Sequence, residues 1–171
     1  MTKNDPQEQY DRFASKYDLI FAERQEKKIN GLKPAIMAAP DGLALDVGAG
    51  TGIANRLLTR EFISSDISRA MLAQGSGQRI QCDLRHLPFE TAMFSLVLSV
   101  SVIRDVTPMD EALTELYRVT ADGGHLVLSI LKTEDLAAAE FLLTTLGGSP
   151  PTRIDLGPDL GFVLEKRNGP L

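Results

Sequence analysis

The residues with the clearest chemical potential are three glycines at every second position, Gly48, Gly50 and Gly52, in the stretch LDVGAGTG. They follow the apolar run 43–47, which is typical of a buried strand, and they precede a segment with helical character. Glycine has no Cβ, so the backbone can turn sharply here and a ligand can approach it closely. Free amides at the start of the following helix could also receive an anionic group. We therefore expect a ligand-binding turn between the first strand and its helix.

Spacing and charge narrow the choice of ligand. A dinucleotide-binding turn has the pattern G-x-G-x-x-G with a third glycine or alanine, but Ile53 or Asn55 stands at that place here. Asp46 lies two residues before the first glycine, where its carboxylate would repel a pyrophosphate. S-adenosylmethionine has no phosphate and carries a sulfonium and an ammonium group, so an acidic neighbour suits it. The sequence thus disfavours a nicotinamide oxidoreductase and favours S-adenosylmethionine as the cofactor.

Two further carboxylates follow expected strands. Asp66 comes after a strand expected over 62–65, at the place where an acid binds ribose hydroxyls in nucleoside sites. Asp83 follows a strand expected over 78–81 and could accept the exocyclic amine of adenine. Each has a plainer alternative, because Asp66 could cap a short helix near Ser68 and Asp83 could be a solvated turn residue. Three acids in register with one glycine turn nevertheless favour a single nucleoside-type site.

The elements that must position these residues alternate along the chain after the turn 40–42. Near-continuous apolar strands between amphipathic helices are typical of a mostly parallel sheet covered on both faces. The last two strands are joined by too few residues for a crossover helix, so they should form a hairpin with one antiparallel strand. Ligands of such sheets sit at the carboxyl ends of the strands. The remaining strands are expected over 94–100, 125–131 (after a turn at 122–124), 152–156 and 161–166, and the helices over 51–59, 68–73, 108–120 and 134–146.

The first forty residues differ from the rest because they carry aromatic side chains among many charges. Tyr10, Phe13 and Tyr17 have the i, i+3, i+7 spacing of one helical face. A second helical piece should follow, interrupted near Gly31 and Pro34. The connection after the fifth strand is too short to hold a covering helix. Only the N-terminal segment could therefore roof the site, and the alternative is a site left open for a larger substrate.

Composition limits the class of protein. The chain has 171 residues, of which 18 are basic and 23 acidic, so its formal net charge is −5. This length supports one sizeable core, and we expect a helical segment over 1–40 and one core domain over 41–171. One cysteine, Cys82, and two histidines disfavour disulfides and metal sites, so no metal is expected. The polar start and the lack of a run of about 20 apolar residues favour a cytoplasmic protein without a membrane span.

The chain resembles the class I S-adenosylmethionine-dependent methyltransferases, and among them most closely the ubiquinone/menaquinone-biosynthesis type. The resemblance covers about residues 10–166 and is carried by YDRFASKYD (10–18), LDVGAGTG (45–52), SSDISRAML (64–72), CDLRHLPFE (82–90), FSLVLSVSVI (94–103) and ELYRVTADGGHLVLS (115–129). It implies a Rossmann-like, doubly wound α/β fold in a single domain. The implied sheet has seven strands in the order 3-2-1-4-5-7-6, with strand 7 antiparallel. It also implies that S-adenosylmethionine is converted to S-adenosylhomocysteine.

The resemblance further implies which residues would hold each part of the cofactor. The glycine turn and the acid before it would hold the methionine end. The second-strand acid and the residues after it would hold the adenosine, and residues after the third strand and in the fourth would contact adenine and lie below the sulfonium. In that order these residues are Asp46, Gly48, Ala49, Gly50, Thr51 and Gly52; Asp66, Ile67 and Met71; and Asp83, Leu84 and Ser99.

The acceptor side departs from the family pattern. Arg104 and Asp105 stand where many members have histidines, which weakens a substrate assignment by family. The chain also lacks an Asn/Asp-Pro-Pro-aromatic motif, the usual signature of methylation at a base or amide nitrogen. A phenol or carbon acceptor would need a base, for which His86 and Asp105 are candidates, although both residues could equally be ordinary loop or turn residues. The substrate or lid residues implied by this comparison are Tyr10, Phe13, Tyr17, Ile103 and Arg104.

These observations favour transfer of a methyl group to a small organic acceptor through an oxygen, carbon or nitrogen nucleophile. Two alternatives stay open: an S-adenosylmethionine-binding regulatory module without catalysis, and a methyltransferase acting on protein or RNA. The acidic balance disfavours a nucleic-acid partner, because no basic excess exists to neutralise phosphates. The sequence leaves a homo-oligomer open.

Overall fold

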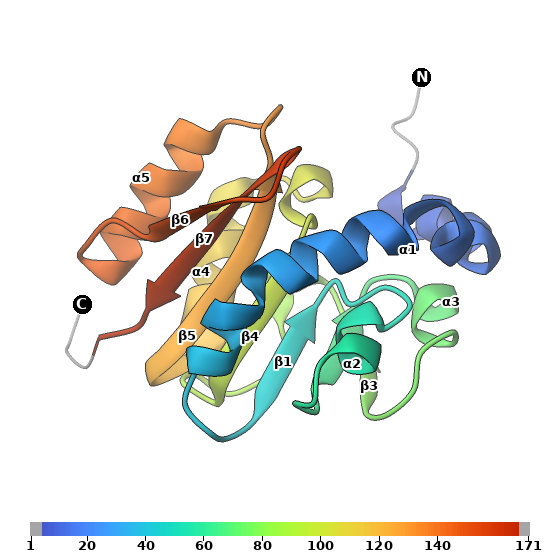
Figure 1. Cartoon of the computed structure of the whole chain (residues 1–171), viewed down its shortest axis with the longest axis horizontal. Coiled ribbons are helices and arrows are strands. Elements are labelled where there is room, and N and C mark those ends of the chain that lie inside the picture. The colour runs from blue at the N-terminus through green and yellow to red at the C-terminus, as the bar shows by residue number, and fades with distance from the viewer. Residues whose placement is uncertain (1–4, 168–171) are drawn as a thin grey trace.

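A seven-stranded sheet forms the centre of the molecule, in the order β3-β2-β1-β4-β5-β7-β6 (Figure 1). The computed structural model describes residues 5–167, except for the side chain of Asp105. All strand pairs are parallel except those of β7, which runs antiparallel to β5 and β6. The predicted strand order and terminal hairpin are confirmed. The strands are β1 (Ala44–Val47), β2 (Ile63–Asp66), β3 (Arg79–Gln81), β4 (Phe94–Val100), β5 (Thr120–Leu131), β6 (Thr152–Asp155) and β7 (Asp159–Glu165).

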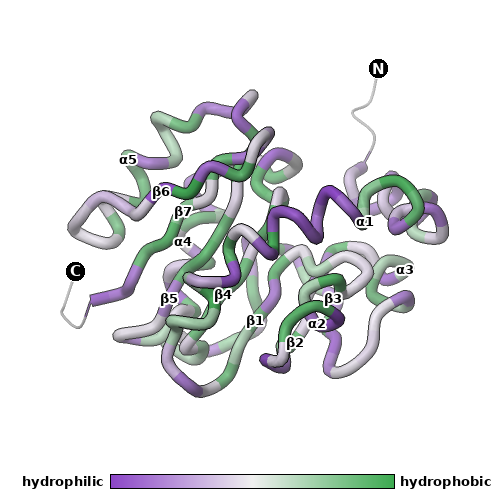
Figure 2. Tube along the Cα trace, viewed as in Figure 1, coloured by the Kyte–Doolittle hydropathy of each residue, from purple (hydrophilic) through white to green (hydrophobic). Residues whose placement is uncertain are grey.

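Helices cover both faces of this sheet. The helical elements are α1 (Pro6–Ala38), α2 (Ile53–Leu57), α3 (Arg69–Leu72), η1 (Leu84–His86), η2 (Ile103–Asp105), α4 (Met109–Val119) and α5 (Leu136–Gly147). Neighbouring residues of β4 point to opposite faces, as the two-residue period of a strand requires. Leu96 and Leu98 pack in the core cluster under α1, whereas Val97 packs in the cluster under α4 and α5. The central strands β1 and β4 are therefore mostly apolar (Figure 2), because they are buried on both sides.

Helix α1 is one continuous helix of 33 residues, so the predicted break near Gly31 and Pro34 is wrong. Its buried stripe includes Leu32 and Ile36, both fully enclosed against the sheet. Gly31 serves close packing, because a Cβ there would lie 2.5 Å from a methyl carbon of Leu156. Burial of this stripe outweighs the cost of about 3 kcal/mol that an internal proline imposes on a helix.

Three other expectations about the elements need correction. Strand β5 begins at Thr120, so the expected turn at 122–124 lies inside the strand. Gly123 and Gly124 are held there by backbone hydrogen bonds to Lys166. The helix expected over 51–59 spans only Ile53–Leu57. Gly52, which precedes it, has a left-handed backbone conformation and therefore belongs to the turn. The two 3-10 helices were not predicted, since three residues are too few for a periodic signal. Among the described residues, no helix has the length and apolar character needed to cross a bilayer.

Candidate functional site

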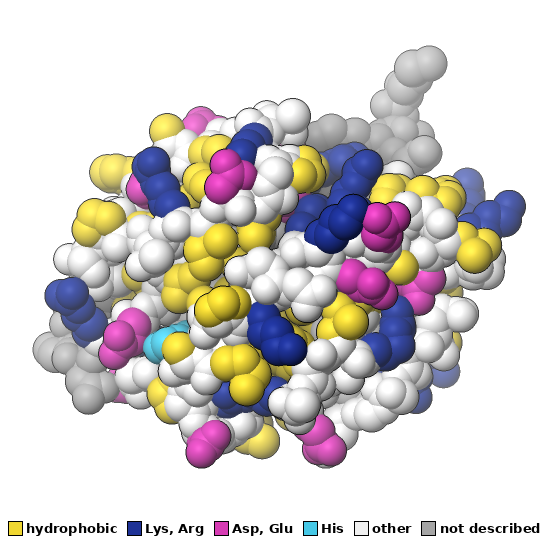
Figure 3. Space-filling view, viewed as in Figure 1, with side chains coloured by type: hydrophobic (Ala, Val, Ile, Leu, Met, Phe, Trp, Pro, Cys, Tyr) yellow, Lys and Arg dark blue, Asp and Glu magenta, His cyan; other side chains and the backbone are white. Residues whose placement is uncertain are grey.

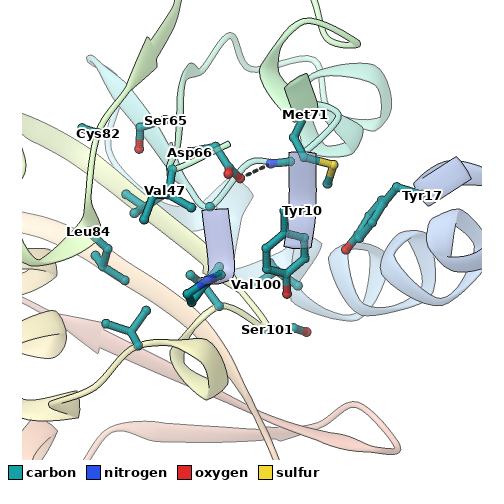
Figure 4. A pocket seen from close by; sticks show the side chains of 16 residues that line it. Tyr10, Tyr17, Val47, Ser65, Asp66, Met71, Cys82, Leu84, Val100 and Ser101 are labelled. Atoms are coloured by element: carbon teal, nitrogen blue, oxygen red, sulfur yellow. Dashed lines mark hydrogen bonds between the residues drawn. The ribbon is translucent and has the colours of Figure 1, made fainter. Parts of the chain in front are cut away.

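A cavity opens at the carboxyl ends of β1, β2 and β4, beneath the N-terminal turns of α1 (Figure 4). Tyr10 and Tyr17 line it from α1. Cys82 and Leu84 line it from the segment after β3, on the opposite side in the close-up view. This is the edge of the sheet at which ligands are expected in a doubly wound fold.

The glycine turn lies at the floor of the cavity in a backbone conformation that favours glycine. Gly48, Gly50 and Gly52 have φ angles of 71°, 56° and 77°. The amides of Gly48 and Ala49 donate to the carbonyl of Ser65 at 2.8 and 2.9 Å, which ties the turn to β2. A Cβ on Gly48 would lie 2.2 Å from a methyl carbon of Val102. The turn therefore requires glycine for its own geometry, before any ligand is considered.

Asp66 connects the glycine turn to α3 and also faces the cavity. Its Oδ2 accepts a hydrogen bond from the Gly50 amide at 2.8 Å, drawn as a dashed line in Figure 4, and its Oδ1 accepts from the Ser68 amide at 2.8 Å. The Gly50 amide in the glycine turn is thus satisfied by this carboxylate. Burial raises the pKa of Asp66, and the backbone hydrogen bonds oppose that shift. The N-cap of α3 is Ser68 rather than Asp66, because the Ser68 hydroxyl accepts a hydrogen bond from the Met71 amide at 3.1 Å.

Asp46 faces a smaller adjoining cavity together with Gln25 of α1 and the glycine turn. Asp46 is 4% exposed, and burial, with a smaller contribution from the charge of Asp66, raises its pKa to about 7. Gln25 Oε1 is buried and has no hydrogen-bond partner among the described residues. None of the described residues that line this cavity is basic. An enclosed carboxylate and an unsatisfied acceptor together suit a cationic group that carries N–H donors.

We expect the Asp46→Asn variant to be more stable than the wild type at high pH. The folded state holds the Asp46 proton at a pKa of about 7 and the unfolded chain near 3.8, so wild-type stability falls as pH rises between these values. The advantage of the variant should grow by about 3 kcal/mol between pH 5 and pH 8. Urea denaturation at both pH values measures this change, with exposed Asp41→Asn as the control. A pH-independent difference between Asp46→Asn and wild type would contradict the assigned ionisation.

Two of the expected cofactor residues lie differently from the sequence interpretation. Asp83 caps η1 by accepting from the Arg85 amide at 2.9 Å, and the Arg85 guanidinium lies 2.5 Å from its Oδ2. These contacts lower the pKa of Asp83. Ser99 is fully buried in β4, and its hydroxyl has no partner among the described residues. Val100 and Ser101 line the cavity where Ser99 was expected. The adenine contact of Asp83 stays a prediction.

The N-terminal half of α1 is fastened across the site by two aspartates. Asp11 Oδ1 accepts from the Ser68 hydroxyl at 2.5 Å. Asp18 Oδ1 accepts from the Thr51 hydroxyl at 2.5 Å, while its Oδ2 pairs with Arg56 at 2.7 Å. Thr51, expected to contact the cofactor, is therefore bound to α1. Both fastening contacts were absent from the sequence interpretation, although the aspartates lie within its YDRFASKYD motif.

The aromatic residues of α1 come together as their spacing indicated. The rings of Phe13 and Tyr17 lie 6.0 and 5.1 Å from the ring of Phe21. Together with Tyr10 they line a second cavity next to the first. Arg104 lines this second cavity as well, whereas Ile103 is buried in the core at 4% exposure.

The two candidate bases receive no support from the geometry. His86 is exposed at the end of η1 and is not among the residues that line either cavity. Asp105 ends η2, and its side chain lies outside the part of the chain that the structure describes. Their catalytic roles stay untested predictions.

A buried ion pair beside the site was not anticipated. Lys28 Nζ of α1 lies 2.9 Å from Asp159 Oδ1 of β7, and both side chains are almost fully enclosed. Lys28 also donates to the Ser101 hydroxyl at 2.7 Å. The hydroxyls of Ser101 and Ser129 donate to Asp159 Oδ2 at 2.6 and 2.8 Å. The sequence signal that could have indicated this buried ion pair is the position of Lys28 directly before Ile29, a buried residue of α1.

Comparison with known proteins shows which sequences this chain is similar to. Residues 45–128 match a family model described as a methyltransferase domain. The chain is 34% identical over 141 residues to a malonyl-[acyl-carrier protein] O-methyltransferase of Herminiimonas arsenicoxydans, covering 77% of this chain and 53% of that protein. It is also 34% identical over 136 residues to a demethylmenaquinone methyltransferase of Thermobifida fusca, covering 70% and 58%. The chain thus spans little more than half the length of these two relatives.

Solved structures share the fold. A magnesium protoporphyrin IX methyltransferase of Synechocystis with bound S-adenosylmethionine superposes with a TM-score of 0.74 at 15% identity, over 97% of this chain and 99% of that chain. A protein of Methanococcus maripaludis superposes with a TM-score of 0.78 at 17% identity, over 100% and 99%. At these identities the likeness shows the common fold.

Proposed function

We propose that this chain is a methyltransferase that transfers a methyl group from S-adenosylmethionine to a small organic acceptor, as the match of residues 45–128 to a methyltransferase-domain model supports. The acidic net charge of −5 supports a small molecule over RNA as the acceptor. The relatives are named for acceptors as different as malonyl-[acyl-carrier protein] and demethylmenaquinone, so their names support no single acceptor for this chain.

The observation that carries this proposal is the buried carboxylate of Asp46 and the half-buried carboxylate of Asp66, which lie on either side of the glycine turn. Asp46 and the unsatisfied Gln25 Oε1 face one cavity, where the ammonium group of the cofactor would supply the missing charge and donors. Asp66 faces the adjoining cavity, and its carboxylate oxygens have acceptor capacity left for ribose hydroxyls. The residues present therefore fit this cofactor.

When bound, S-adenosylmethionine supplies a methyl group activated by the positively charged sulfur. The residues of this chain bind and orient the reactants. Helix α1 lies across the cavity and would exclude water, and alignment of donor and acceptor can account for up to about 7–11 kcal/mol of the barrier. The contacts of Asp11 with Ser68 and of Asp18 with Thr51 would hold the 1–40 segment as a lid over the 41–171 core.

Calorimetric titration with S-adenosylhomocysteine tests the proposed cofactor site. We expect the Asp66→Ala variant to bind more weakly than the wild type by about 1.5–3 kcal/mol, because it loses charge-assisted hydrogen bonds. Asp155→Ala, which removes an exposed carboxylate paired with Lys132 on the surface, is the matched control and should bind like the wild type. Equal affinity of Asp66→Ala and wild type would remove the assigned role, and no binding to any of the three proteins would remove the proposed function.

A further inference from the structure

The second cavity adjoins the proposed cofactor site. It has a volume of about 210 Å³, and Tyr10, Tyr17 and Ser101 line both it and the first cavity. In Figure 4 Tyr10 and Ser101 lie close together, with Tyr17 on the same side of the first cavity. A molecule in the second cavity would therefore be next to a molecule in the first, which is the geometry that transfer between the two requires.

The two sites have opposite charge. Among the described residues that line the second cavity, Arg24, Lys28 and Arg104 are basic and none is acidic. The charged residues that line the proposed cofactor site are Asp66 and Asp46, both acidic. Charges of both signs are interspersed over the surface in Figure 3, and the net charge of the chain is −5, so a lining of one sign is not a general property of this protein.

Ser101, which lines the second cavity, is held in place by several hydrogen bonds. Ser101 has a φ of 61°, a region that residues other than glycine rarely enter, and its amide donates to Ser129 at 3.1 Å. Its hydroxyl is held between Lys28 and Asp159. The Lys28 ammonium donates to this hydroxyl and lies 2.9 Å from Asp159 Oδ1. Asp159 balances the charge of Lys28, so the positive charge available to a ligand in this cavity comes from Arg24.

The walls of the second cavity are aromatic. Phe13, Tyr17 and Phe21 contribute rings from one face of α1. An enclosed apolar cavity of about 150 Å³ is large enough to accept benzene. The larger space here thus accommodates a ring of that size together with a small charged substituent.

We propose that this second cavity binds the methyl acceptor, and that the acceptor is an organic acid with an apolar body and a carboxylate. The inference rests on the proposed function for the identity of the neighbouring cofactor. The aromatic walls would hold the apolar body, and the Arg24 guanidinium would hold the carboxylate. The arrangement keeps an anionic acceptor beside a cationic donor, so each reactant is attracted to its own cavity.

Fluorine NMR with 4-fluorobenzoate and 4-fluorobenzamide tests this inference, since the two probes match in shape and differ in charge. In the presence of saturating S-adenosylhomocysteine, we expect the wild type to bind the benzoate at least tenfold more tightly than the benzamide. Arg24→Gln should weaken benzoate binding at least fivefold and leave benzamide binding unchanged. Lys27→Gln removes an equal charge from the neighbouring exposed position of α1, outside the cavity lining, and should change neither value.

Each result decides between separate claims. Equal binding of the two probes, equal effects of Arg24→Gln and Lys27→Gln, or no binding of either probe at millimolar concentration would overturn the acceptor assignment. Calorimetry on the same samples reports whether S-adenosylhomocysteine binds. If S-adenosylhomocysteine does not bind, the proposed function is refuted. If it binds normally but the protein binds the charged and the neutral probe equally well, only the acceptor class is refuted.

Discussion

Replacing Lys28 by methionine is expected to lower the free energy of unfolding by about 3–5 kcal/mol. Lys28 is 3% exposed and Asp159 is fully enclosed, so the substitution leaves a buried carboxylate without a counter-ion. Ser101 and Ser129 still donate hydrogen bonds to Asp159, but neutral hydroxyls cannot replace the positive charge. The pair also joins α1 to β7, so α1 loses this ion-paired attachment to the sheet.

Urea denaturation followed by circular dichroism measures this loss. Lys27→Met is the matched control, because Lys27 is exposed on the same helix and pairs with Glu23 at the surface, where such pairs contribute about 0–1 kcal/mol. The double variant Lys28→Met with Asp159→Asn should recover part of the loss, because no unpaired charge is then buried. If Lys28→Met costs no more than Lys27→Met, the ion pair does not hold α1 in place.

The Gly48→Ala variant is expected to lose about 2–5 kcal/mol of stability and, with it, the affinity for S-adenosylhomocysteine. A left-handed conformation costs a residue with a Cβ about 1–2 kcal/mol, and overpacking adds about 1–3 kcal/mol. Overpacking applies here because the added carbon would lie 2.2 Å from Val102. The turn must therefore shift, and this shift would disturb the hydrogen bond from the Gly48 amide to the Ser65 carbonyl.

The Gly77→Ala variant separates the cost of the left-handed backbone from the cost of overpacking. Gly77 has a φ of 78°, close to the 71° of Gly48, but nothing lies within 4 Å of its added Cβ. This variant should lose only the backbone contribution of about 1–2 kcal/mol and bind S-adenosylhomocysteine normally. Thermal and urea unfolding with parallel titrations would compare the two proteins. Equal losses of stability and equal affinities would show that the clash with Val102 is relieved without moving the turn.

The sequence by itself determined the alternation of strands and helices, the terminal hairpin and the place of the site, and its family resemblance implied the strand order. The first three follow from local signals: apolar runs of strand length, a connection too short for a crossover, and glycines at every second position before α2. Asp46 and Asp66 were identified for the same reason, since each stands at the end of a strand whose register is set by burial on both faces. The predicted break in α1 failed because it relied on the local preferences of Gly31 and Pro34, which the burial of Leu32 and Ile36 outweighs.

Tertiary structure alone decided which side chains complete the site. Gln25 lines the same cavity as Asp46, and Lys28 pairs with Asp159, only because α1 crosses the sheet over β4, β5 and β7. Residues so far apart in the chain have no spacing that marks them as partners. Likewise, the separation of an acidic from a basic cavity cannot be seen in a net charge of −5, because a sum over the chain contains no positions. The folded backbone assigns each charge to its cavity.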